Sequence, residues 1–349
     1  MNLLTQLFRW FGGGSTVMEE APPMPRPAAD CDLPTTKAPL SDEAPPPAPG
    51  WWAPRGEVVA SLTEARIGSE PIASDLYDAL SQTLNDPQLE LPRIPQVANR
   101  ALTMLRDASI DFHQLARVVE TDQALAASVL RTANSAAYRG YNEITNLEQA
   151  FLRMGQRALR SMVLGFSIKH LAIRTGGPQR TLGEELWRRS TASAVICGHF
   201  AVQHGLAADE AFLVGLLHDI GMLAVSRVTN DFQVKTGRRF AREVFDSLCE
   251  EWHEHIGLRL ADEWNLPSPL PELIGNHHSE IAADDPLRLH RSLIALSDVV
   301  CSMLEIAPYV PYDFFNLACV RELGIQDDEQ TRLNLSRLPE LIRSRSDIG

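Results

Sequence analysis

From about Ser74 onwards, apolar residues recur at intervals of three and four positions, which is the spacing of one face of an α-helix. No stretch of comparable length alternates apolar and polar residues as a half-buried strand does. The sequence therefore predicts an all-α domain over 75–345, with a helical N-terminal part over about 85–175 and a second helical part over about 180–345. The helical spacing of the first part is carried by Val97, Ala101, Leu102, Leu105, Leu115, Val118, Val119, Leu125, Val129 and Leu130.

The first 74 residues have a different composition. Eleven of the 23 prolines lie between Pro22 and Pro54, and proline at this density sustains neither a helix nor a β-ladder. We expect residues 13–74 to form a disordered linker. Trp51 and Trp52 either dock onto the folded part or, as the more cautious expectation, are exposed in this linker. Residues 2–11, NLLTQLFRWF, place their apolar side chains on one helical face and predict an amphipathic helix over 1–12. This helix either binds a membrane surface or a partner, or is a frayed terminus.

Charge and cysteine content restrict the partners and the compartment. The formal net charge of −13 repels nucleic acid, so we expect no nucleic-acid partner. The five cysteines form no C-x-x-C pair and are odd in number, which indicates free thiols in a reducing cytoplasm. No apolar run approaches the roughly 20 residues that span a bilayer.

The segment Phe212–Val225, FLVGLLHDIGMLAV, places His218 and Asp219 side by side in an otherwise apolar stretch. Asp298 repeats this pattern in SLIALSDVVCSML. A buried carboxylate requires a hydrogen-bond donor or a cation. On one helix His218 and Asp219 would project about 100° apart, so converging helices can direct both to one interior point. The pair predicts a divalent metal ligand set, a buried ion pair or a capped helix kink.

Three further histidines follow, His253 in EEWHEHIG and the adjacent His277 and His278 in IGNHHSE. The order H-D, H, H-H, D resembles that of the HD superfamily of metal-dependent phosphohydrolases. Over about 85–305 the chain resembles more specifically the HDOD family, the HD-related output domains of bacterial signalling proteins. The segments that carry this resemblance are LPRIPQVANRALTML, ETDQALAASVLRTANSAAYRG, FLRMGQRALRSMVLG, FLVGLLHDIGMLAV and HIGLRLADEWNLP.

The resemblance also exposes a departure at Arg189 in LWRRSTASA, which stands where HD enzymes carry their first metal-ligating histidine. A guanidinium has donors only and a fixed positive charge, so it cannot ligate a metal. We therefore predict that Arg189 replaces the cation and lies within salt-bridge distance of Asp219 or Asp298, with no catalytic residue and no cofactor. The vestigial metal residues would be His218, Asp219, His253, His277, His278 and Asp298. The G-Y-P element of the branch that hydrolyses cyclic di-GMP is missing after the double histidine, where the chain reads SEIAADDPL.

A second group of residues is basic. Eight Arg and Lys residues lie between Arg153 and Arg189, against only two glutamates. These residues are either solvated helix faces or a site for a phosphorylated ligand or an acidic partner. The candidates for phosphate or partner binding are Arg153, Arg157 and Arg160. Asn134, which lies among small alanines, is expected to satisfy a neighbouring backbone group.

The resemblance and the departure together predict a bacterial signal-transduction protein whose domain binds a protein partner or a signal molecule instead of turning over a substrate. Two alternatives remain open. The first is a metal-dependent phosphohydrolase that uses a divalent metal without the missing histidine. The second is a non-hydrolytic sensor of a nucleotide second messenger. We expect a cytoplasmic protein that makes peripheral contact with the inner membrane if residues 2–11 bind it.

Overall fold

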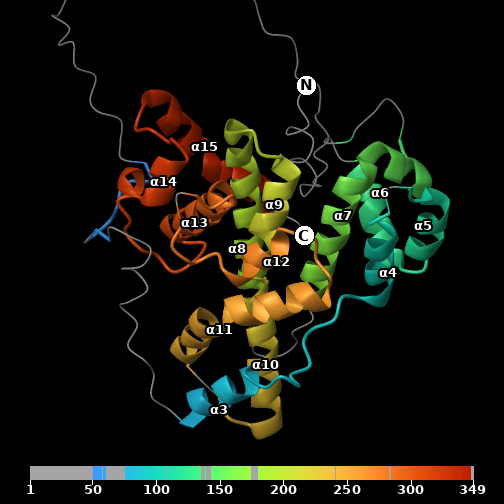
Figure 1. The fold of residues 1–349 in the computed structure, drawn as a ribbon, viewed down its shortest axis with the longest axis horizontal. Helices are drawn as coiled ribbons and strands as arrows, with labels where there is room; N and C mark the ends of the chain where they lie inside the picture. The colour runs from blue at the N-terminus through green and yellow to red at the C-terminus, as the bar shows by residue number, and fades with distance from the viewer. Residues whose placement is uncertain are drawn as a thin grey trace, which may run out of the picture.

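The computed structural model describes residues 50–56, 58–59, 75–107, 109–134, 138, 143–173, 180–239, 241–282 and 284–346. The predictions for the helix 1–12 and for the linker residues 13–49 and 60–74 lie outside the described residues. Within the described ranges the regular elements are helices and there is no strand, which confirms the all-α fold (Figure 1).

The N-terminal part is a bundle of four helices on the right of Figure 1. Its helices are α4 (Gln96–Met104), α5 (Phe112–Val119), α6 (Gln123–Asn134) and α7 (Leu147–Ile173). The side chain of Asp111 caps α5 by accepting from the backbone N–H of His113 at 2.8 Å. Helix α7 is kinked at Gly155, whose φ of 78° favours glycine. Asn134 bonds both the N–H and the C=O of Ile144, which confirms its predicted structural role.

The second part is centred on α8, which packs against α9, α13 and α15, while α10 packs along α11. The helix α3 (Asp75–Leu84) contacts α10 and α11, so it joins the second part although the first part follows it in the chain (Figure 1). The helices of this part are α8 (Arg180–Ala201), α9 (Ala208–Leu217), α10 (Ile220–Thr236), α11 (Arg242–Glu263), α12 (Leu270–Gly275), α13 (Arg288–Met303), α14 (Ala318–Glu322) and α15 (Glu329–Ser346).

Two glycines allow the central helices to approach backbone to backbone. A Cβ added to Gly215 would lie 2.5 Å from the carbonyl oxygen of Ser193 on α8. A Cβ added to Gly221 would lie 1.9 Å from the carbonyl oxygen of His253 on α11. Both distances are far below a van der Waals contact, so only glycine permits these approaches. The segment between α9 and α10 is thereby fixed against both α8 and α11.

The run Ala208–Thr236, which contains α9 and α10, is long and apolar enough to cross a membrane by length and composition. The expectation that no apolar run reaches such a length is therefore wrong, because the apolar composition continues from α9 into α10 across the H-D pair. In the structure 94% of its most apolar window is buried inside the fold. Its hydrophobicity is accounted for by packing in the core.

The tryptophan pair that precedes the domain packs against it. The indole N–H of Trp51 donates to the carbonyl oxygen of Leu335 at 2.8 Å, and its ring meets Phe314 edge to face at 5.5 Å between centroids. Trp51 and Trp52 are both half-buried, so the expectation that they are exposed in a linker is wrong. The reason is that an indole ring gains by burying its large apolar surface once its N–H finds an acceptor.

Candidate functional site

His218 and Asp219 lie at the junction between α9 and α10, not within one helix as the sequence predicts. His218 follows the last residue of α9, and Asp219 leaves the helical region with φ −97° and ψ 17°. The ring Nδ1 of His218 lies 2.9 Å from the carbonyl oxygen of Gly215, one turn earlier. Both side chains are buried, with 0% and 4% of the surface of His218 and Asp219 exposed. The break in the helix lets both face the same interior region.

One oxygen of Asp219 belongs to a cluster of two acids, one arginine and one histidine, which we call the arginine half. Its members are Asp219, Asp298, Arg189 and His218. Arg189 Nη2 lies 2.9 Å from Asp219 Oδ2 and 3.2 Å from Asp298 Oδ1. His218 Nε2 lies 3.2 Å and 3.3 Å from the same two oxygens. The guanidinium therefore makes the contacts that the sequence analysis predicts for it, with both acids at once.

The protonation states of the arginine half follow from its charges. Burial opposes protonation of His218, but the carboxylates of Asp219 and Asp298 outweigh it and raise the pKa of His218 to about 10. Burial would raise the pKa of each acid, yet Arg189 and His218 hold the pKa of both Asp219 and Asp298 below the usual range. Near neutral pH two cations thus face two anions. His218, Asp219 and Asp298 are close enough to hold a metal ion, but Arg189 and protonated His218 already neutralise the two carboxylates.

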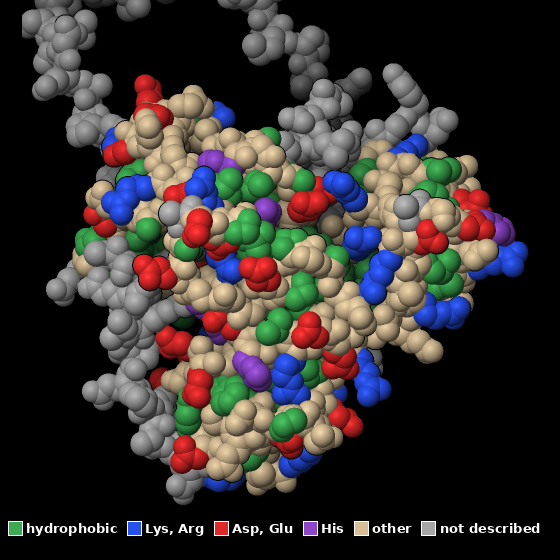
Figure 2. All heavy atoms as spheres, in the orientation of Figure 1, with side chains coloured by type: hydrophobic (Ala, Val, Ile, Leu, Met, Phe, Trp, Pro, Cys, Tyr) green, Lys and Arg blue, Asp and Glu red, His purple; other side chains and the backbone are tan. Residues whose placement is uncertain are grey.

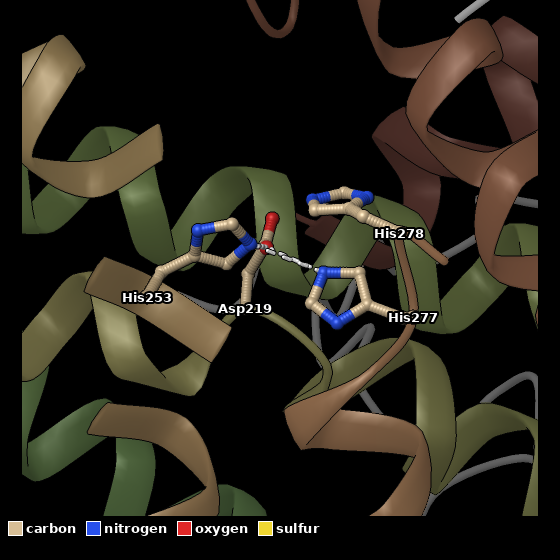
Figure 3. A group of neighbouring side chains, drawn as sticks. All are labelled: Asp219, His253, His277 and His278. Carbon is tan, nitrogen blue, oxygen red and sulfur yellow. Dashed lines mark hydrogen bonds and ion pairs between the residues drawn. The ribbon is translucent and has the colours of Figure 1, made fainter. Parts of the chain in front are cut away.

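On the other side of Asp219 lies a cluster of three histidines, His253 from α11 and His277 and His278 from the turn after α12, which we call the histidine half (Figure 3). Figure 3 shows the three rings and the Asp219 carboxylate drawn together in one small region. One donor atom from each residue lies within 4.8 Å of the others. His253 Nε2 and His277 Nε2 are 3.3 Å apart.

The Nδ1 hydrogen bonds of His253 and His277 leave the Nε2 atoms of these two rings facing one another. His253 Nδ1 lies 2.5 Å from the carbonyl oxygen of Cys249, and His277 Nδ1 lies 3.0 Å from that of Ile274. Since a carbonyl only accepts, each Nδ1 carries a proton, which leaves Nε2 as the ring atom available to a metal ion. Burial lowers the pKa of His253 to about 4, so that ring is neutral. Asp219 Oδ1 also has no hydrogen-bond donor among the described residues.

These acceptors fit a divalent metal ion. Asp219 Oδ1 lies 3.5 Å from His277 Nε2 and 3.8 Å from His253 Nε2. Ligands at about 2.1 Å from a tetrahedral ion are about 3.4 Å from one another, close to the separations seen here. Three imidazoles and one carboxylate suit zinc and related first-row metals. The histidine half fits a metal, and the arginine half does not.

Two residues that sequence reasoning missed position the double histidine. Glu254 Oε1 accepts the backbone N–H of His278 at 2.8 Å. Arg291, 4% exposed, pairs with Asp285 at 2.7 Å and donates to the carbonyl oxygen of Asn276, directly before the double histidine. Glu254 is next to His253 in the sequence, and this position could have identified it as a residue of the site. Arg291 has no comparable local signal because its partners lie on another segment.

The three arginines proposed for phosphate binding do not all line one hollow. Arg160 lines a cavity of about 480 Å³ together with Arg106, which the sequence analysis did not identify. Arg157 and Arg160 both line a smaller neighbouring hollow of about 180 Å³, where Arg157 lies 4.0 Å from Glu210. Arg153 lies outside the lining of these two hollows in the described part of the chain.

Comparison with known proteins places these observations in a family. Residues 91–280, more than half of the chain, match the family model of the HDOD domain. An uncharacterized protein of Treponema pallidum is 21% identical over 272 residues, which are 74% of this chain and 51% of that protein. The chain therefore spans about half the length of this curated relative.

Solved structures show the same fold. A candidate metal-dependent phosphohydrolase of Shewanella amazonensis is 20% identical, with a TM-score of 0.60 over 78% of this chain and 97% of that one. A candidate signal transduction protein of Marinobacter aquaeolei is 22% identical, with a TM-score of 0.51 over 81% of this chain and 62% of that one. At these identities the likeness establishes the fold alone.

Proposed function

Because this chain belongs to the HDOD domain family, we propose that it is a bacterial signal-transduction protein whose domain acts by binding a protein partner or a signal molecule and not by hydrolysing a phosphoester. The Marinobacter aquaeolei structure of the same fold is described as a candidate signal transduction protein, which supports the signalling part of this proposal. The non-catalytic part depends on the geometry around Asp219.

The observation that carries the non-catalytic part is the position of Arg189. A two-metal phosphohydrolase stabilises both the attacking and the leaving oxygen between two cations about 3.5–4 Å apart. Here the guanidinium of Arg189 lies within 3.2 Å of both acids of the arginine half and cannot exchange its ligands as a metal does. The chain keeps the charge of one cation and loses its Lewis acidity.

The histidine half supports the same conclusion. Asp219, His253, His277 and His278 would hold one divalent ion, and four protein ligands complete a tetrahedral shell. Such a closed shell is typical of structural zinc, whereas catalytic zinc keeps a position open for water. Bound there, the ion would supply a fixed positive charge that joins α10, α11 and the double histidine.

A hydrolysis assay tests the proposal. The full chain is incubated with bis(p-nitrophenyl) phosphate and p-nitrophenyl phosphate in the presence of Mn²⁺, Fe²⁺ or Zn²⁺. We expect no metal-dependent release of p-nitrophenol from the wild type above that of the His277→Ala variant. Release by the wild type that is lost in His277→Ala would overturn the non-catalytic proposal.

The phosphohydrolase alternative has one observation in its favour, which is the fit of the histidine half to a metal. It requires this ion to give up one protein ligand to water. The same assay separates the two functions, because a single-metal enzyme would retain its turnover in Arg189→Met and lose it in Asp219→Asn.

The location of the protein is a separate proposal. We propose that it is cytoplasmic and that residues 2–11, which lie outside the described residues, attach it to the inner membrane or to a partner. Fractionation of cells that express the full chain or a variant lacking residues 2–11 tests this. An unchanged distribution and unchanged co-purifying proteins would contradict it.

A further inference from the structure

A cavity of about 480 Å³ lies where the N-terminal part meets the turn after α11. Arg106 enters it from the turn after α4, and Arg160 enters it from α7. Its apolar wall includes Leu102, Leu164, Leu266 and Pro267. The volume is within the range of small-molecule sites. Lys and Arg side chains gather on the surface over α4 and α7 (Figure 2).

The two guanidiniums are fixed but not neutralised. Arg160 Nη2 donates to the carbonyl oxygen of Leu105 at 2.6 Å. Arg106 donates to the carbonyl oxygens of Trp264, at 3.4 Å, and of Asn265. Among the described residues neither arginine forms an ion pair with a carboxylate. Two positive charges therefore face one cavity with their orientation already set.

The environment of Arg160 adds to this imbalance. Its Nε is buried without a hydrogen-bond partner among the described residues. Burial and the nearby charges of Arg106 and Arg157 lower the pKa of Arg160, which means that its positive charge is repelled. An anion in the cavity would relieve this repulsion and supply the missing acceptor.

We propose that this cavity binds a small ligand that carries a phosphate group and an apolar ring. Guanidinium groups match the oxygens of phosphate in a fork that gives both strength and direction. The leucine and proline side chains provide an apolar surface for the ring. Because the lining comes from α4, α7 and the turn after α11, the ligand would join the two helical parts. This inference goes beyond the proposed function, since no residue of the arginine half lines this cavity.

Calorimetric titration of the full chain tests the proposal with phenylphosphonate, whose C–P bond a phosphohydrolase does not cleave. Inorganic phosphate and benzyl alcohol are the matched ligands that lack the ring or the charge. We expect saturable binding of phenylphosphonate, at least about tenfold tighter than of inorganic phosphate because the ring is buried. Benzyl alcohol should show no saturable binding.

The variants Arg106→Gln and Arg160→Gln should each weaken phenylphosphonate binding at least about tenfold, because each removes a charged donor. The matched control is Arg100→Gln, an exposed arginine on α4 that does not line the cavity and changes the net charge equally. Its affinity should stay within about twofold of the wild type. The variants Arg106→Lys and Arg160→Lys keep the charge and lose the fork, so they should bind with intermediate affinity.

Three results would overturn the proposal. The first is no saturable binding of phenylphosphonate to the wild type, and the second is equal weakening in Arg100→Gln. The third concerns the source of the phosphate. The protein would sediment with vesicles that contain phosphatidic acid, this sedimentation would depend on Arg106 and Arg160, and phenylphosphonate would not bind. Such a result would assign the site to a lipid headgroup. None of these results alters the hydrolysis assay, so failure here is distinguishable from failure of the proposed function.

Discussion

Arg189 Nη2 lies 2.9 Å from Asp219 Oδ2, and only 4% of the Asp219 side chain is exposed. The contact joins α8 to the junction between α9 and α10 and places a permanent positive charge beside an acid that the fold has removed from water. A buried acid is tolerated only when its charge is compensated. Asp219 therefore depends on Arg189 for its ionised state, and its other oxygen faces the histidine half.

Removing the guanidinium should be costly. Arg189→Met keeps most of the side-chain length but leaves Asp219 and Asp298 with His218 as their one close cation among the described residues. Breaking a buried ion pair by deleting one partner costs roughly 3–5 kcal/mol, so we expect a loss of this order in the free energy of unfolding. Urea denaturation in EDTA measures it. The exposed neighbour Arg188→Met is the control and should change stability by less than about 0.5 kcal/mol. Equal small effects would contradict the ion-pair account.

The raised pKa of His218 predicts a pH dependence of stability. The folded chain holds this proton up to about pH 10, whereas an unfolded histidine loses it near pH 6.5. The stabilisation is therefore fully present below about pH 6.5 and is lost as the pH rises towards 10. The slope can reach about 1.4 kcal/mol per pH unit. Denaturation in EDTA between these limits should show this slope in the wild type and a reduced slope in His218→Asn. An identical slope in both proteins would exclude His218 as its source.

Gly221 should not accept a side chain. The Cβ of Gly221→Ala would lie 1.9 Å from the backbone oxygen of His253, so α10 and α11 would have to separate. Overpacking of this kind costs typically 1–3 kcal/mol, and roughly the upper end is expected against backbone. Gly257→Ala, on α11, is the control, because its Cβ would meet a side-chain methyl group of Ile274 at 2.8 Å and not a backbone atom. Thermal denaturation should rank Gly221→Ala as the less stable variant, and the reverse order would contradict the packing described here.

Glu254 should control metal affinity without ligating the ion. Its Oε1 fixes the backbone N–H of His278 and lies 3.5 Å from His277 Nδ1. Loss of such an outer partner typically weakens metal binding about 10–100-fold. Titration of Co²⁺, followed by its visible absorption, should show this loss in Glu254→Ala. The exposed Glu250→Ala on the same helix should bind as the wild type does. Equal affinity in both variants would remove Glu254 from the histidine half.

The sequence carries the order of the site residues better than their geometry. The apolar context of His218, Asp219 and Asp298 predicts burial. The resemblance to HD enzymes, in which a metal-ligating histidine stands at the position of Arg189, predicts the contact of Arg189 with the acids. A helix break at Asp219 is one of three alternatives that the sequence leaves open, because an apolar run with helical spacing does not show where two helices meet. The sequence also does not show that one oxygen of Asp219 faces the arginine half and the other faces the histidine half, because these contacts join distant segments of the chain.

The basic residues illustrate the same limit. Arg153, Arg157 and Arg160 are close in the sequence, yet the cavity joins Arg160 with Arg106 from a different helix pair. Charge density along a chain does not reveal which side chains share a cavity, because that depends on how the helices pack. The position of Trp51 and Trp52 stays open at the level of sequence for a related reason, since proline density describes the local backbone and not the surface on which two indoles can pack.

The stoichiometry of bound metal in wild type and in Arg189→His tests the central claim most directly. Each protein is saturated with Mn²⁺ or Zn²⁺, freed of excess metal and analysed by mass spectrometry for metal per chain. If Arg189 holds the place of a cation, the wild type should bind at most a single equivalent, at the histidine half. Arg189→His should bind a second equivalent that raises its melting temperature, because it restores a ligand and removes a repelling charge. A wild type that binds two equivalents, with His218 and Asp298 as ligands, would contradict the account.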